Sequence, residues 1–189
     1  MFKKMVLTSV AAVMACAVYA AEFPLKVWES SDAEGVISDL QGNNFLYTVT
    51  SDYKNAGSKY TQPIGWVRVR SILNGKIGFN VEKLNQFECE LAVSADSPLK
   101  TPISISVASF TGKKDAVYLP QEFESGKTYQ IIVPFKALRR LDAAALKRVE
   151  SVQFVFREAA LPDGKPVKFR FSGLRLTSGD AEAIKVQVK

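Results

Sequence analysis

The stretch that decides the fold reads Val167-Lys168-Phe169-Arg170-Phe171-Ser172-Gly173-Leu174-Arg175-Leu176. Its first half alternates apolar and polar residues, which is typical of a β-strand with one buried face. The parity of the apolar residues then changes, because Leu174 and Leu176 fall out of step with Phe171. A β-bulge at Ser172-Gly173 would return all five apolar side chains to one face, and glycine suits a bulge. The stretch therefore predicts a long, bulged strand that covers a core.

Short runs of the same kind recur along the chain and predict further strands. They are residues 66–70, 87–93, 103–107, 129–133, 152–156 and, as a last edge strand, 184–188. Turn signals such as Thr111-Gly112, Ser125-Gly126 and Pro162-Asp163-Gly164 separate several of them. Residues 135–149 are the one helical candidate, with an apolar face suited to a short crossing segment. The pattern predicts an all-β fold, a two-sheet antiparallel sandwich with one short helical crossing.

The N-terminus has the three parts of a secretory signal peptide. Lys3 and Lys4 form a positive region, residues 5–18 are apolar and small with no charge, and Val18-Tyr19-Ala20 is a small-residue cleavage site. The apolar run stops short of the roughly 20 residues that a membrane span needs. We therefore expect residues 1–20 to be removed and residues 21–189 to form one domain, exported to a periplasm or the cell exterior. The less favoured alternative is a lipid anchor on Cys16, in a loose bacterial lipobox.

Composition narrows the class of ligand. The chain carries a net charge of +6, has no histidine and has only two cysteines, Cys16 and Cys89. Export argues against nucleic acid, so acidic glycans or a membrane surface are the more plausible acidic partners. Cys89 lies on the apolar parity of its strand and is expected to be a buried free thiol. With no histidine, nucleophile elbow or metal-ligand spacing, the sequence predicts no enzyme.

The second half carries a family resemblance. It runs Gly126-Lys127-Thr128-Tyr129-Gln130-Ile131-Ile132-Val133-Pro134-Phe135, then a leucine-rich crossing, a strand, Gly164 and the closing strand. This order resembles carbohydrate-binding modules of the galactose-binding-like jelly roll, and it is similar to the complex I intermediate-associated protein family. Trp28-Glu29-Ser30-Ser31-Asp32 and the segment from Tyr47 to Asp52 look like the family's opening strand and its aromatic-Ser-Asp segment. The resemblance implies a jelly roll that binds glycans.

Such modules stack aromatic faces on sugar rings and orient them with a few polar groups. The predicted ligand-binding residues are Trp66, Arg68, Arg70, Tyr60, Tyr118 and Tyr53. If Val67 and Val69 point inward, Trp66 lies on an outer face beside Arg68 and Arg70. The alternative is that a loop covers this face and Trp66 belongs to the core. Trp28 is expected in the core.

Basic residues suggest what kind of glycan would bind. Arg157, Lys168 and Arg170 also fall off the apolar parity of their strands, and with Arg68 and Arg70 they could form one basic stripe. Arginine pairs well with carboxylates and sulfates. The hypothesis is that the ligand is an acidic or sulfated glycan, and a neutral glycan is left open. The alternative is that these basic residues lie scattered on a solvated sheet face and bind no ligand.

The sequence predicts no cofactor, and it leaves a structural calcium ion open. Asp32, Glu34 and Asp39 lie close together in sequence, but calcium takes six to eight oxygen ligands and solvated loop charges are the simpler reading. The favoured function is an exported, stand-alone, non-catalytic carbohydrate-binding domain. The alternative is an envelope structural or interaction protein that keeps the jelly roll without binding sugar. No oligomeric state is indicated.

Overall fold

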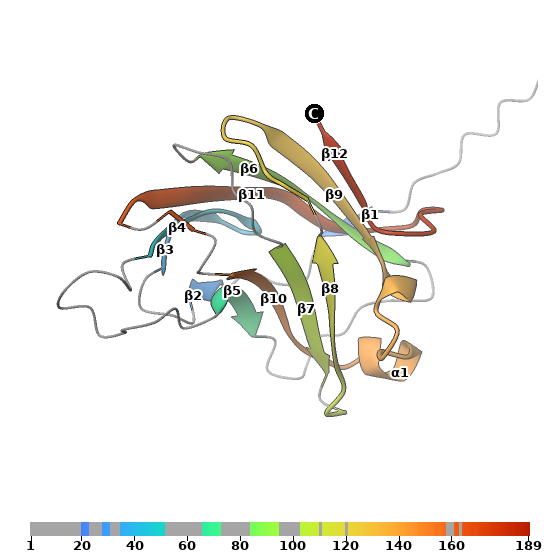
Figure 1. The fold of residues 1–189 in the computed structure, drawn as a ribbon. Coiled ribbons are helices and arrows are strands. Elements are labelled where there is room, and N and C mark those ends of the chain that lie inside the picture. The colour runs from blue at the N-terminus through green and yellow to red at the C-terminus, as the bar shows by residue number, and fades with distance from the viewer. Residues whose placement is uncertain are drawn as a thin grey trace, which may run out of the picture.

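Strand β11 (Pro166–Thr177) lies in the middle of the larger of two antiparallel sheets (Figure 1). The structure is a computed structural model that describes residues 20–22, 28–30, 35–51, 66–72, 84–94, 103–109, 111–119, 121–157, 161–162 and 164–189. Within these ranges the larger sheet has the strand order β12-β9-β6-β11-β4-β3, and β1 also pairs with β11. Its other strands are β1 (Ala20–Glu22), β3 (Gly35–Gln41), β4 (Asn44–Thr50), β6 (Gln86–Ser94), β9 (Thr128–Pro134) and β12 (Lys185–Val188).

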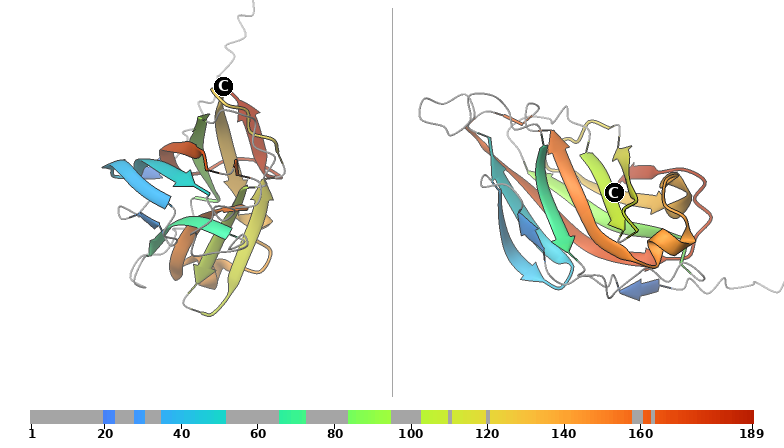
Figure 2. Two further views of the ribbon diagram at one scale, coloured as in Figure 1. Left: turned by 60° about the vertical axis from the view of Figure 1, so that its left-hand side comes forward. Right: turned by 90° about the horizontal axis from the view of Figure 1, so that it is seen from below.

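The smaller sheet faces the larger one and has the order β2-β5-β10-β7-β8 in the described part of the chain. Its strands are β2 (Glu29–Ser30), β5 (Trp66–Ile72), β7 (Ile103–Ser109), β8 (Lys114–Leu119) and β10 (Val149–Arg157). Figure 2 shows the two layers from the side and from below. The predicted all-β sandwich of antiparallel strands is confirmed, and each predicted strand is present within a few residues of its expected bounds.

The predicted bulge is present in β11. Its pairing with β6 shifts register between Ser172 and Arg175, and Gly173 has a φ of 61°, in the left-handed region that favours glycine. Val167, Phe169, Phe171, Leu174 and Leu176 are all buried in the core. The extra residue therefore does what the change of parity predicted, because it keeps both halves of the strand facing inward.

Aromatic rings join the two sheets in the core. Phe154 of β10 packs on Phe171 of β11 with ring centroids 4.4 Å apart, and Phe156 packs on Phe169 at 4.2 Å. Trp28 is buried against Phe45, 4.8 Å between centroids. The expectation that Trp28 belongs to the core is confirmed. These large rings account for much of the apolar area that folding removes from water.

The predicted helical crossing is shorter and more broken than the apolar pattern suggested. A 3₁₀ turn, η1, spans Phe135–Ala137, and α1 spans only Ala143–Leu146. Leu138 has non-helical angles, φ −84° and ψ 73°, so the chain cannot continue one helix through it. Asp142 then caps α1 by accepting from the Ala145 amide at 2.8 Å. The apolar face of this segment is nevertheless buried as expected. The spacing of apolar residues predicts which side chains are buried better than it predicts whether one helix runs through them.

Cys89 is buried in β6, as its parity predicted, and is a free thiol. Burial, together with the nearby negative charges of Glu90 and Glu88, raises its pKa to about 12.

Among the described residues, no helix is long and apolar enough to cross a membrane.

Candidate functional site

The outer face of the smaller sheet brings together the predicted ligand-binding residues that the structure describes. On β5 Val69 is fully buried, whereas the Arg70 side chain keeps about a third of its surface exposed. The predicted inside-outside alternation of this strand is thus confirmed at these two residues. Trp66 and Arg68 have described backbones, in register with Arg157 and Val155 of β10, but their side chains lie outside the described structure.

Among the described side chains of this face, Tyr118 is the exposed aromatic residue. It lies on β8, with 54% of its surface exposed. Its backbone is in register with Ser104 of β7, which is in register with Val155 of β10. Val155 is only 8% exposed, yet it does not belong to the core cluster that contains Phe154 and Phe156. Strand alternation places it on the outer side, so an apolar position lies in the same row of the sheet as Tyr118.

Polar side chains occupy the neighbouring row. Gln153 is in register with Arg70, which pairs on its other side with Glu29 of β2. The Arg70 Nε donates to Glu29 Oε1 at 2.8 Å, and the Gln153 amide donates weakly to Ser151 at 3.4 Å. Exposed Arg157 ends the same strand. We call Arg70, Ala116, Tyr118, Gln153, Val155 and Arg157 the Tyr118 face. It combines one aromatic ring, two apolar positions and several hydrogen-bonding groups.

The predicted basic stripe is wrong as a single feature. Lys168 and Arg170 belong to β11 in the larger sheet, whereas Arg70 and Arg157 belong to β5 and β10 in the smaller sheet. The two pairs therefore lie on opposite outer faces of the sandwich. Parity shows that a residue points away from the core, but it does not show which sheet the strand joins. Arg170 is also engaged, since its guanidinium contacts Asp39 at 2.9 Å.

The remaining predicted residues lie outside the part of the chain that can be compared. Tyr53 and Tyr60 are outside the described residues, as are Asp32 and Glu34 of the calcium hypothesis. Asp39 is described, and its carboxylate is paired with Arg170. Among the described residues, no group of three or more histidine, cysteine or acidic side chains could hold a metal ion.

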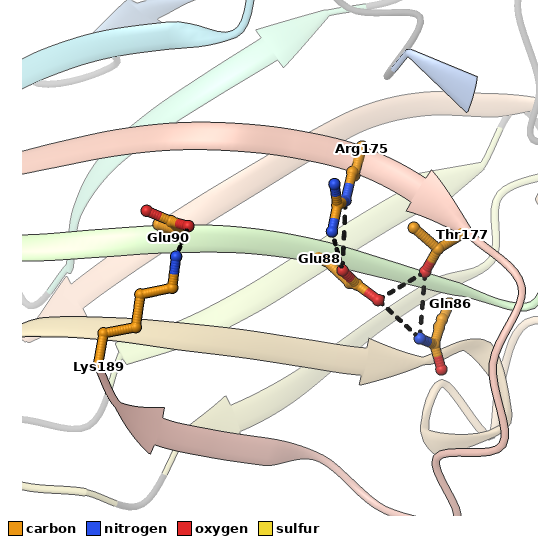
Figure 3. A network of polar contacts seen from close by, with 6 residues as sticks. All are labelled: Gln86, Glu88, Glu90, Arg175, Thr177 and Lys189. Carbon is orange, nitrogen blue, oxygen red and sulfur yellow. Dashed lines mark hydrogen bonds and ion pairs between the residues drawn. The ribbon is translucent and has the colours of Figure 1, made fainter. Parts of the chain in front are cut away.

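The larger sheet carries a polar network that the sequence did not predict, and Figure 3 shows it in detail. Glu88 accepts hydrogen bonds from Arg175, Thr177 and Gln86, and Glu90 separately pairs with Lys189. Burial opposes ionisation of Glu88, but its hydrogen bonds from Arg175, Thr177 and Gln86 outweigh that effect and lower its pKa. The only signal was that Glu88 and Glu90 flank Cys89 on the outer parity. The network joins β6 to β11 at the bulge.

Comparison with known proteins shows a shared fold. No protein family model matches this chain, and no curated protein matches it. Among solved structures, an agarase matches with a TM-score of 0.56 and 10% identity, over 81% of this chain and 23% of the agarase chain.

Carbohydrate-binding modules are also among the structural neighbours. A family 11 module from Clostridium thermocellum, in complex with a β-1,3-1,4-mixed-linked tetrasaccharide, has a TM-score of 0.46 and 16% identity, over 84% of this chain and 86% of the module. A family 30 module of a cellulosomal cellulase from the same organism has a TM-score of 0.49 and 11% identity, over 87% of this chain and 92% of the module. A shared fold does not by itself transfer a function.

Proposed function

We propose that the protein is exported and that its mature domain binds carbohydrate on the Tyr118 face without catalysing a reaction. The observation that carries the proposal is the exposed Tyr118 ring on a sheet face that also carries the polar side chains of Arg70 and Gln153. The structural neighbours that are carbohydrate-binding modules support the same class of ligand.

The chemistry of this face suits a sugar. A tyrosine ring offers an apolar surface on which the C–H side of a pyranose packs, and its hydroxyl offers a hydrogen bond. Sugar hydroxyls then need nearby donors and acceptors. Gln153 supplies both, while Arg70 and Arg157 supply guanidinium donors. A sheet fixes the spacing of these groups in advance, which lowers the entropic cost of binding.

The spacing of the face favours an extended oligosaccharide. Tyr118 and Arg70 lie three strands apart in the order β5-β10-β7-β8, which corresponds to about 14 Å across the sheet. One sugar ring cannot contact both side chains. A chain of several sugars laid across the strands can reach both. The backbone of Arg68, on β5, lies in the same row of the sheet as Val155 and Tyr118.

A second candidate, an envelope structural or interaction protein, is favoured by a different surface. Val36 is 63% exposed on β3, an edge strand of the larger sheet, and Leu40 of the same strand is also exposed. Exposed apolar residues on an edge strand suit contact with another protein. On this alternative, Val36→Ala would weaken an envelope association and no glycan would be bound.

Affinity electrophoresis of the mature domain tests the proposal. The gels contain agarose, mixed-linked β-glucan, mannan or polygalacturonate, each against a gel without polysaccharide. We expect at least one polysaccharide to retard the wild type and Tyr118→Ala to abolish that retardation. Val36→Ala, an apolar truncation at an exposed position of the other sheet, is the matched control and should migrate like wild type. Retardation by none of the neutral polymers, or equal retardation of wild type and Tyr118→Ala by them, would overturn the proposal.

The mature mass tests the export part separately. Expression in a bacterium with an intact signal peptidase should yield a protein that starts at Ala21 and carries no lipid. A full-length mass in the cytoplasm would contradict export. A lipid-modified start at Cys16 would replace the soluble form with an anchored one.

A further inference from the structure

The outer face of the larger sheet, opposite the Tyr118 face, carries a hollow of about 320 Å³. Residues of three neighbouring strands and of the Gly126 turn line it: Leu46, Ala92, Val93, Ser94, Gly126, Lys168 and Arg170. Its volume is at the lower end of the roughly 300–1,000 Å³ typical of small-molecule sites.

The strand register explains why this part of the face is hollow. Arg170 of β11 lies between Leu46 of β4 and Ala92 of β6, and Lys168 lies in register with Ser94. The long basic side chains of β11 therefore stand beside very small side chains on β6. Gly126, at the turn before β9, adds no side chain. The result is a depression with an apolar floor and two cationic groups along one wall.

The charges around the hollow leave it positive. On this face Glu88 is paired with Arg175 and Glu90 with Lys189, and at the nearby turn Glu124 pairs with Lys127. Asp39 takes one nitrogen of Arg170, which leaves further guanidinium donors, since arginine has five N–H groups. Lys168 is exposed and has no acidic partner in the described part of the chain.

We propose that this hollow binds the carboxylate or sulfate group of an acidic glycan, as a second site on the face opposite Tyr118. The inference rests on the proposed carbohydrate-binding function for its class of ligand. Lys168 supplies a point charge, Arg170 and the Ser94 hydroxyl supply directed donors, and Leu46 with Ala92 supplies apolar contact for the sugar ring. The domain would then hold neutral stretches of a glycan on one face and charged groups on the other.

Paired polymers that differ only in charge provide the test. Dextran sulfate is compared with dextran, and polygalacturonate with its methyl ester, against the mature domain. The variant is Lys168→Gln. Its matched control is Lys185→Gln, which removes the same charge from exposed Lys185 on β12, the far strand of the same sheet. Lys168→Arg keeps the charge.

We expect Lys168→Gln to weaken binding of the acidic polymers about threefold to tenfold, with Lys185→Gln and Lys168→Arg close to wild type. Equal losses in Lys168→Gln and Lys185→Gln would show general charge attraction and overturn the inference, as would no preference for the acidic member of either pair.

The Tyr118→Ala variant separates the two proposals. If it loses binding of neutral glycans while Lys168→Gln behaves as wild type on the acidic polymers, the Tyr118 face stands and the second site fails. If Lys168→Gln alone weakens binding, the hollow stands and the Tyr118 face fails.

Discussion

Arg175 and Glu88 meet across the β-bulge of β11, where the guanidinium donates from Nη2 and Nε to one carboxylate oxygen at 2.9 and 3.3 Å. The other oxygen of Glu88 accepts from Thr177 at 2.8 Å and from Gln86 at 2.9 Å. Figure 3 shows these contacts. The Glu88 side chain is only 12% exposed. The bulge places Arg175 directly opposite Glu88. The same irregularity therefore keeps the apolar side chains of β11 in the core and brings the two charged groups together.

Arg175→Ala should destabilise the fold by about 1–2 kcal/mol at pH 7, because a largely buried carboxylate loses its cationic partner. The pKa of Glu88 is below its ordinary 4.5, so its ionised form stabilises the folded state above that pH. This contribution disappears as the pH falls through the lower, folded-state pKa. Urea unfolding at several pH values should therefore show a wild-type advantage that shrinks in acid. An advantage that stays constant with pH would assign Arg175 a packing role only.

Gly173→Ala should cost about 1–2 kcal/mol through its backbone alone. The residue has a φ of 61°, and no heavy atom lies within 4 Å of where a Cβ would be. Gly173→Asn should lose less, since asparagine tolerates this conformation better than alanine. Urea midpoints of the two variants provide the measurement. Equal losses for alanine and asparagine would speak against a conformational cause.

Gly179→Ala should be destabilising for a steric reason. An added Cβ would lie 2.4 Å from the Gln86 side-chain nitrogen. That amide is buried and held by Glu88 and Thr177, so it cannot swing aside without losing both hydrogen bonds. We expect a loss of about 2 kcal/mol or more, and Gln86→Ala in the same chain should recover part of it. If the double variant is as unstable as the sum of the two single variants, the clash is not the cause.

Tyr118→Phe should bind within about twofold of wild type if the ring acts by stacking, since the phenyl face keeps the apolar contact. A loss as large as that of Tyr118→Ala would instead assign the binding energy to the hydroxyl. Titration calorimetry with the best polysaccharide of the electrophoresis panel measures both. The thermal midpoints should not change, because Tyr118 is exposed on an edge strand.

Cys89 should resist alkylation in the folded protein and react fully in urea. The thiolate is the reactive form, and the buried thiol has a pKa of about 12. Because the folded pKa is higher than the unfolded value of about 9, stability is undiminished below pH 9 and falls as the pH rises from there. Iodoacetamide labelling at pH 8, measured by mass spectrometry, tests the resistance of Cys89 to alkylation. Rapid labelling without denaturant would contradict the burial.

The sequence predicted the fold well because two signals are local. The alternation of apolar and polar residues shows which face of a strand is buried, and turn residues show where a strand ends. The slip at Ser172-Gly173 located a bulge before any pairing was known, and Val69 confirmed the inward parity of β5. The crossing was predicted less well. Leu138, Leu141 and Leu146 are buried at helical spacing, but caps and turns rather than spacing decide where a helix continues.

The site could be predicted only within one strand at a time. Alternation placed Arg70 on an outer face, and the same rule placed Arg170 on an outer face, but the two faces are opposite sides of the molecule. Which strands become neighbours depends on pairings between distant segments, and the alternation pattern carries no record of them. The same holds for Glu88 and Arg175, which lie far apart in sequence and meet through the pairing of β6 with β11.

The central position of β11 also determines when the larger sheet can be completed during synthesis. Its residues 166–177 fill the space between β6 and β4, which are both made much earlier along the chain. Until β11 has been synthesised, the edges of β4 and β6 that pair with it remain unpaired. Unpaired strand edges can pair with other chains. Pairings between distant segments are also slow to form. The larger sheet therefore cannot close between β4 and β6 until residues 166–177 have been synthesised.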